Sequence, residues 1–409
     1  MKSYHIIFLL LSSLLLFTSC TNAPNEPTED KIRSLTQTEK QLVSSADKFG
    51  LKLFKKVNEV EQNNNLFISP LSVSLALGMT LNGANTSTYD SMRATLELPN
   101  ISQEEINQSY KSLIELLTGI DPKVNFKIAN SIFYRNSLTF EKDFIEVNKK
   151  YFDALIGALN FDDPSSVDII NQWVKDNTNG KIDRIVDKIG NNTIMFLINA
   201  LYFKGTWKFE FDKQKTKDDL FILQNGTQSP CKMMVQETEF NYFENQEFQA
   251  IDLPYGNGAF SMTIFLPKPG VNINSFISDI SETDWNNWLS SFTSRKVKLY
   301  LPKFKLEYEL EMKNVLTSLG MGIAFDPYNA DFTKLYRGFE RAYISKVKHK
   351  TFVDVYEEGT EAAAVTSVEI GIDSIGGEIT VMQCDRPFVF TIRENNSGTI
   401  LFIGKIIKP

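Results

Sequence analysis

The part of the chain that follows residue 35 begins with apolar residues at the spacing of amphipathic helices. Residues 51–57 place four apolar side chains on one helical face. Ser69-Pro70 has the signature of a helix start, because serine caps a helix and proline fits its first turn. The stretch that follows, up to Leu81, is apolar at most positions, so we expect a helix buried all round. Further helical patterns cover residues 106–118, 140–151 and 167–177.

Later in the chain the pattern changes to the β-branched and aromatic runs of strands. Turn signals separate these runs, with Gly256 and Gly258 between two of them and 395–398 before the last. Helices first and strands later, without regular βαβ alternation, indicate an α+β class with largely antiparallel sheets in one domain. The predicted strands are 193–203, 259–266, 296–301, 379–383, 388–393 and 399–407.

The first 19 residues have the layout of a secretory signal, with Lys2 followed by a short apolar run over 6–17. The ending Phe17-Thr18-Ser19-Cys20 resembles the bacterial lipobox, which implies cleavage before Cys20 and a lipid on its sulfur. The alternative is an ordinary signal peptide with an incidental cysteine. We expect a signal peptide (1–19), a lipidated polar tether (20–34) and a folded domain (35–409), held extracytoplasmically by lipid on a bacterial membrane, with the cell surface as one candidate location.

The composition of the chain excludes some classes of protein and argues against others. Of the 409 residues, 42% are hydrophobic, which is enough for a large core and excludes a disordered chain. A net charge of −7 argues against nucleic-acid binding, which needs a cationic face.

The sequence offers few of the residues and motifs that usually carry catalysis. The sequence has two His and three Cys, and it lacks the common hydrolase, zinc-protease and nucleotide-binding motifs. Past the signal, His349 is the one histidine left, and it lies in a strand-like run. We therefore expect no enzyme, no metal and no cofactor. Cys231 and Cys384 have apolar neighbours, which favours two buried thiols over a disulfide bridge.

Residues 357–374 (EEGTEAAAVTSVEIGIDS) alternate in character. Even positions from Thr360 to Ile372 are uncharged, whereas the acidic residues from Glu361 onward fall on odd positions. This period of two is a strand signature with one core face. No proline, which would bar a central strand position, occurs between Pro327 and Pro387. The segment is either a permanent strand or an exposed loop that can become one, and composition does not choose.

The run 357–364 (EEGTEAAA) closely resembles the hinge of the reactive-centre loop of inhibitory serpins. Other segments resemble serpin landmarks in the same order and spacing, and together they cover about residues 35–409. The resemblance implies the serpin fold: one α+β domain with three β-sheets, about eight or nine helices and an exposed reactive-centre loop. The further matching segments are 65–72 (NLFISPLS), 178–182 (TNGKI), 199–207 (NALYFKGTW), 301–304 (LPKF) and 385–388 (DRPF).

The same resemblance implies a mechanism. A target protease attacks the loop and forms an acyl-enzyme, and the cleaved loop then inserts as a new strand in the main sheet, which traps the protease; serpin loop insertion is a known example of strand addition and released strain. The implied hinge is Glu357, Glu358, Gly359, Thr360, Glu361, Ala362, Ala363, Ala364, Val365 and Thr366.

Two supporting groups are carried over from the family. Ser69, Ser72, Asn199 and His349 match a cluster beneath the opening point of the sheet, which implies that His349 forms hydrogen bonds between separable strands. At the base of the loop, Lys303 matches a partner of Glu357, and Trp207 is expected to pack there.

The bait bond follows from the usual length of the family's loop. Seventeen residues counted from Glu357 place cleavage between Asp373 and Ser374, which implies a protease that prefers an acidic residue. Ile372, Ile370 or Val368 would instead suit an elastase-like enzyme with an apolar pocket.

The expected function is inhibition of a serine protease, with a cysteine protease as the other candidate target. The alternative is a non-inhibitory serpin-fold binding or carrier protein. The expected partners are the target protease and, through the lipid on Cys20, a membrane. We expect a monomer.

Overall fold

A computed structural model describes residues 33–338, 341–360 and 379–409. All of these except Arg33 belong to one compact unit, Ser34–Pro409. None of the helices in these ranges combines the length and the apolarity that a membrane span requires.

The predicted helices are confirmed. The helix expected after Ser69 runs over Pro70–Leu81, with the Ser69 side chain accepting from the Ser72 amide and Pro70 in its first turn. All its residues but one are buried. The α-helices of the described residues are α1 (Gln37–Val60), α2 (Pro70–Leu81), α3 (Thr86–Thr95), α4 (Gln103–Gly119), α5 (Lys142–Phe152), α6 (Ser165–Asn177), α7 (Ile273–Asp279), α8 (Glu282–Ser290) and α9 (Lys313–Leu316). Short turns lie at η1 (Lys213–Lys215), η2 (Thr317–Met321) and η3 (Gly322–Phe325).

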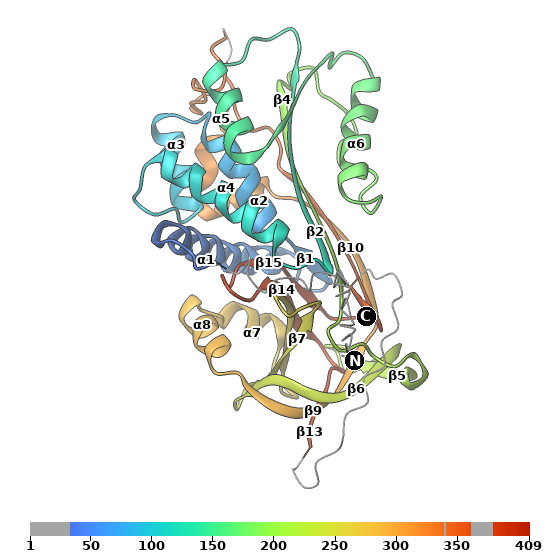
Figure 1. Cartoon of the computed structure of the whole chain (residues 1–409). Coiled ribbons are helices and arrows are strands. Elements are labelled where there is room, and N and C mark those ends of the chain that lie inside the picture. The colour runs from blue at the N-terminus through green and yellow to red at the C-terminus, as the bar shows by residue number, and fades with distance from the viewer. Residues whose placement is uncertain (1–32, 339–340, 361–378) are drawn as a thin grey trace, which may run out of the picture. The chain divides into compact units, whose positions relative to one another are not determined.

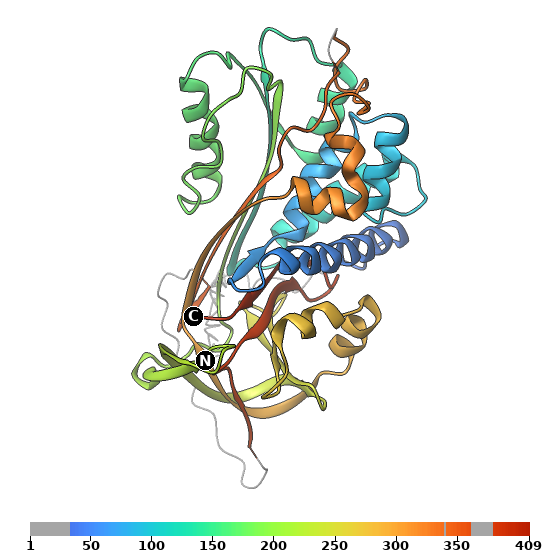
Figure 2. The same cartoon turned by 180° about the vertical axis from the view of Figure 1, so that it is seen from behind.

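A six-stranded sheet forms the first layer. Helix α6 lies on one of its faces, and α2, α4 and α5 lie on the other, as both views show (Figure 1 and Figure 2). Two of its strands, β2 and β3, fall in the part of the chain that the sequence predicted as mostly helical. The strands, in spatial order, are β10 (Phe304–Glu311), β11 (Lys348–Tyr356), β12 (Gly359–Thr360), β4 (Met195–Thr206), β2 (Val124–Arg135) and β3 (Leu155–Leu159).

A nine-stranded sheet forms the second layer, and α7 and α8 pack on it through Phe276 and Trp288 against Phe248. The 17-residue strand β6 pairs with β5 and β9 and also with β7, so the third sheet that the resemblance implied is continuous with the second. The strands are β1 (Leu66–Ile68), β15 (Ile400–Ile406), β14 (Phe388–Glu394), β8 (Phe260–Pro267), β7 (Phe248–Tyr255), β6 (Gln228–Glu244), β9 (Thr293–Pro302) and β13 (Thr380–Gln383), with β5 (Lys217–Ile222) beside β6.

Two apolar clusters fill the space between layers. The large one lies between the sheets and the helices α1 to α5. A smaller one packs α6 and the segment after it onto the outer face of the six-stranded sheet; it consists of Phe133, Phe161, Ile170, Val174, Ile182, Val186 and Ile198. This second cluster places α6 directly over β2 and β4.

Candidate functional site

The short strand β12 is wedged between β11 and β4 at one end of the six-stranded sheet. Thr360 pairs with Val355 of β11 and with Gly205 of β4. Gly359 has φ +153°, and a Cβ there would lie 2.1 Å from the Gly205 carbonyl oxygen. Any other residue at 359 would therefore push the strands apart. The first residues of the predicted hinge thus already form a central strand.

The side chain of Thr360 is fully enclosed. Its residue is 2% exposed, and its hydroxyl lies 2.6 Å from the hydroxyl of Tyr255, which is itself buried. The Tyr255 ring stacks on Trp207 at 4.4 Å between centroids. The Trp207 indole Nε1 donates to the Tyr356 carbonyl at 2.9 Å. Trp207 therefore packs at the base of the loop, where the resemblance placed it.

The acidic pair before Gly359 is held by ionic contacts. Lys303 Nζ donates to Glu357 at 2.8 Å, and the Thr216 hydroxyl donates to the other oxygen of that carboxylate at 2.8 Å. Burial opposes ionisation of Glu357, but these two donors outweigh it and lower the pKa of the carboxyl. Glu358 pairs with Lys213. The base of the loop is therefore fixed to the segment after Trp207 by charge.

Replacing Glu357 by Gln is expected to lower the free energy of unfolding by about 1–2 kcal/mol, because a buried, charge-assisted pair is lost. Urea unfolding measures this. Glu115→Gln, which removes an exposed pair with Lys111 at 4.0 Å, is the matched control and should change stability by less than ~0.5 kcal/mol. Equal losses in the two variants would contradict the anchoring of the loop base.

Beyond β12, the strands β11 and β4 form a seam. Each pairs with β12, and within the described residues no backbone pairing joins them to each other. A cavity of about 20 Å³ lies in the seam, large enough for about one water. Its walls come from β4, β11, β15 and the turn after α6: Thr178, Lys181, Ile182, Leu201, Tyr202, Phe203, Phe352 and Phe402.

The predicted cluster of Ser69, Ser72, Asn199 and His349 meets at the end of α2. The Ser69 amide donates to His349 Nε2 at 3.0 Å, and the Ser72 hydroxyl donates to the Asn199 carbonyl at 3.5 Å. The Asn199 side chain donates to Asn130 of β2 at 2.8 Å. The structure thus brings the four residues together, but it ties β11 and β4 separately to the cap of α2, with no hydrogen bond between His349 and Asn199.

His349 is held neutral in this cluster. The residue is 6% exposed, and desolvation lowers its pKa to about 4. A neutral Nε2 can accept from the Ser69 amide, whereas a protonated one cannot. The geometry suits a structural hydrogen bond.

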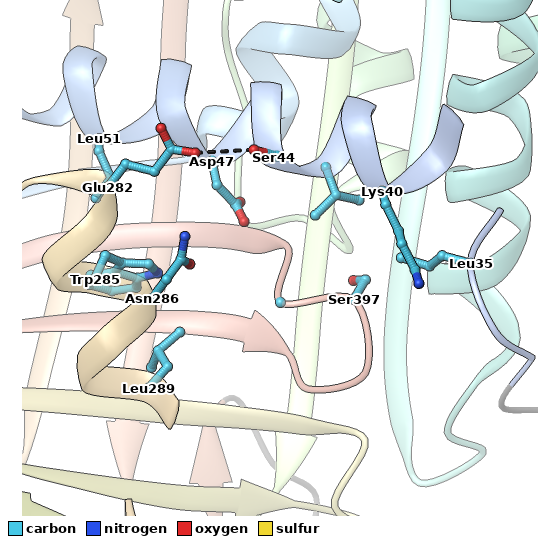
Figure 3. A pocket seen from close by; sticks show the side chains of 12 residues that line it. Leu35, Lys40, Ser44, Asp47, Leu51, Glu282, Trp285, Asn286, Leu289 and Ser397 are labelled. Atoms are coloured by element: carbon cyan, nitrogen blue, oxygen red, sulfur yellow. Dashed lines mark hydrogen bonds between the residues drawn. The ribbon is translucent and has the colours of Figure 1, made fainter. Parts of the chain in front are cut away.

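A second hollow, of roughly 160 Å³, lies between α1, α8 and the turn that joins β14 to β15 (Figure 3). The Ser44 hydroxyl donates to Glu282 at 3.1 Å across its mouth. Asp47 accepts from the Ile400 amide at 2.9 Å, and burial raises the pKa of this carboxyl to about 8. The hollow contains neither histidine nor cysteine, and within the described residues no group of three acidic, His or Cys side chains is placed to hold a metal.

Several predicted site residues lie outside the described residues. These are the bait-bond candidates Asp373, Ser374 and Ile372, the hinge residues from Glu361 to Thr366, and Cys20. The other two cysteines are free thiols; Cys384 is buried as expected, but Cys231 is only half-buried, because it lies on β6 opposite the outer strand β5.

The sequence prediction missed part of this site. Tyr255, Gly205, Thr216 and Lys213 complete the surroundings of the loop base, and Asn130 holds the Asn199 side chain. Asn130 carries the clearest signal that went unused, since this amide and the neighbouring Ser131 interrupt the apolar residues of 128–133.

Comparison with known proteins supports the family resemblance that the sequence motifs indicated. The profile of the family described as Serpin (serine protease inhibitor) matches residues 44–409. The leukocyte elastase inhibitor of Equus caballus is 32% identical over 381 residues, covering 90% of this chain and 100% of its own. The thermophilic serpin tengpin in its native state superposes with a TM-score of 0.84 at 35% identity, over 92% of this chain and 96% of that one. Human thyroxine-binding globulin, solved in complex with thyroxine, superposes with a TM-score of 0.83 at 27% identity, over 91% of this chain and 99% of that one.

Proposed function

This chain belongs to the serpin family, and from that membership we propose that it inhibits a serine protease by offering residues 357–374 as bait and inserting them into the six-stranded sheet. The observation that carries the proposal is β12, which already pairs with a strand on either side and leads into the seam. The inhibitory name of the Equus caballus relative supports the same function.

The register of β12 gives the position that each residue of the loop would take if the loop inserted. If it continues by whole residues, Ala362 would lie between Val353 and Phe203, and Thr366 between His349 and Asn199. The odd-numbered residues of β11 on this face, from His349 to Val355, are buried. Even-numbered loop positions would therefore enter the core, and those positions are the uncharged ones in the sequence.

Small residues suit the start of the seam. Phe203, Phe352 and Phe402 leave only the small cavity between the strands, so a bulky side chain entering first would clash. Alanine at 362–364 meets this limit. The later apolar positions, Val368, Ile370 and Ile372, would each contribute roughly 1.5–3 kcal/mol on full burial.

We propose the Asp373–Ser374 bond as the bait, with Ile372 as the competing position. Incubation with a panel of proteases of acidic, elastase-like and basic specificity tests both the function and the bond. We expect a covalent complex that survives denaturing electrophoresis, and a released C-terminal fragment that begins at Ser374. A fragment that begins elsewhere corrects the bond alone. Free turnover by every protease that cuts the loop refutes inhibition.

A binding or carrier module is the second candidate, and the similarity to thyroxine-binding globulin favours it. A binding module and an inhibitor differ in one measurable respect. Loop insertion should raise the thermal stability of the cleaved chain strongly, whereas a module that does not insert its loop should melt at the same temperature before and after cleavage.

We also propose that Cys20 carries the lipid and holds the chain, as a monomer, on the outer side of a bacterial membrane. The sequence around Cys20 supports this assignment. Mass spectrometry of the N-terminal peptide tests it directly: a diacylglyceryl adduct on Cys20 is expected, and an unmodified cysteine would refute it.

A further inference from the structure

Strand β5 and the first residues of β6 form a two-stranded ribbon, residues 217–232, at the edge of the nine-stranded sheet. Within the described part of the chain, β5 pairs with β6 alone. The turn between them is closed by a hydrogen bond from the Leu223 amide to the Thr227 carbonyl at 2.8 Å. In both views the ribbon projects from the end of the molecule where β13 also lies (Figure 1 and Figure 2).

The inner face of the ribbon is fixed to the body of the domain. Phe221 is buried, and its ring meets the ring of Phe388 at 6.5 Å between centroids. At the other end of the ribbon, the Lys303 amide donates to the Lys232 carbonyl at 2.8 Å. The ribbon therefore holds its outer face in one fixed position.

The outer face of the ribbon is apolar at its centre. Leu220 and Ile222, two positions apart on β5, lie on the same side and are 47% and 40% exposed. Leu220 lies opposite Pro230 of β6, which is also exposed. Next to them Asp218 pairs with Lys232 at 2.7 Å across the two strands. The three apolar residues thus form one patch with an ionic border.

This layout is typical of a protein interface. Single exposed apolar side chains are common on any protein, but neighbouring ones inside a polar border mark a contact surface. Edge strands usually carry charges that keep other proteins away, and the centre of this one does not. The ribbon has two lysines and two aspartates, so it has no net charge to attract a partner over a distance. Its recognition must be apolar.

The ribbon is attached on both sides of the proposed bait. Thr216, directly before β5, donates through its hydroxyl to Glu357 at 2.8 Å, and Glu357 opens the bait segment. The Ile222 amide, at the end of β5, donates to the Asp385 carbonyl at 2.7 Å, shortly after β13. A specific protein complex buries about 800 Å² of each partner. A protease that binds the bait is therefore expected to contact the ribbon as well.

We propose that Leu220, Ile222 and Pro230 form an accessory contact for the target protease, which lays an apolar side chain from the border of its substrate groove against the ribbon. This inference rests on the proposed function and adds a property of the partner. Among proteases with the same preference at the bait bond, it selects those with an apolar border over those with a charged one.

The accessory contact acts before the loop inserts. The ribbon belongs to the nine-stranded sheet, whereas the seam lies between β11 and β4 of the six-stranded sheet. The patch should therefore change how tightly the protease docks and leave the later insertion step unchanged. Because the contact is apolar, its effect should persist at high salt, where contacts between exposed charges are screened.

The test uses the protease of the panel that forms the stable complex fastest, with its catalytic nucleophile replaced by alanine so that it docks without cutting. Its Kd is measured for the full chain and for a Leu220→Thr, Ile222→Thr double variant, since threonine suits a strand. We expect binding about tenfold weaker in the double variant, the equivalent of ~1.4 kcal/mol, at low and at high salt. Leu155→Thr with Val271→Thr is the control, because these residues are exposed to a similar degree, 49% and 39%, on other parts of the domain. It should bind as the original does.

Urea unfolding checks that each variant is folded, and Leu220→Thr alone, expected to bind about threefold more weakly, gives a second measurement. With the active protease, the double variant should form its complex about tenfold more slowly, with the same number of chains cleaved per stable complex.

Equal affinity of the original and the double variant, or an equal loss in the control, refutes the accessory contact and leaves the proposed function standing. More cleavage per complex at unchanged affinity refutes it too, because the two residues would then act on insertion. If no protease forms a stable complex with the original chain, the proposed function fails, and the accessory contact fails with it.

Discussion

Replacing Thr360 by Arg is expected to convert the chain from an inhibitor into a substrate. The Thr360 side chain is enclosed by β11, β4 and the Tyr255 hydroxyl, so a guanidinium there would be buried without a partner. An unpaired buried charge costs several kcal/mol. Because β12 is already part of the sheet, the guanidinium would displace it from between β11 and β4, and the rest of the loop would lack the strand from which insertion continues. The acyl-enzyme would then have time to hydrolyse. The number of chains cleaved per stable complex should rise by about 10² or more, since 1.36 kcal/mol is a factor of ten.

Two variants make this measurement specific. Thr360→Ser keeps the hydroxyl that meets Tyr255 and should inhibit almost normally. Glu361→Arg introduces the same guanidinium one residue later, at a position that the alternation of the sequence places on the opposite, solvated face. Only Thr360→Arg should abolish the complex. Retained inhibition in that variant would contradict insertion along the seam, and loss in all three would point to general damage to the loop.

Helix α2 and the buried strands β8, β14 and β15 were predictable because local chemistry and tertiary packing agree in them. Helix α2 has its cap at Ser69, proline at its start and apolar residues throughout, and it lies where the pattern placed it. Strand β2 was missed for the opposite reason. Lys127, Asn130 and Ser131 interrupt its apolar run. Asn130 and Ser131 lie on opposite faces of the strand and are both buried, and the Asn130 side chain finds its partners only far along the chain.

The candidate site was predictable only in part, for a similar reason. The hinge and the pair of Glu357 with Lys303 could be expected from a resemblance over short motifs, and the structure places that pair at 2.8 Å. The contacts of Lys348 with Asp187 and of Lys350 with the Arg184 carbonyl join residues more than 150 positions apart, and in the sequence these charges look like any solvated surface. Only the fold shows that they lie on opposite sides of one seam.

A His349→Gln variant is expected to lose the acid sensitivity of this cluster. The pKa of His349 is about 4 in the folded chain, against an ordinary value of 6.5, because its neutral imidazole is buried. The unfolded chain therefore binds more protons between these values, and stability must fall as pH falls from about 6.5 to about 4. The full difference corresponds to ~3 kcal/mol at 1.36 kcal/mol per pH unit.

Glutamine can offer a side-chain carbonyl oxygen to the Ser69 amide but has no proton to gain in this range. Urea unfolding of both proteins at several pH values between 4 and 7 gives a difference curve. Asp47, whose raised pKa changes stability in the opposite direction, contributes equally to both proteins and cancels in this curve. We expect the original chain to lose stability relative to the variant as pH falls. Parallel curves would mean that the cluster tolerates a protonated His349, and that the Ser69 bond is not what joins β11 to α2.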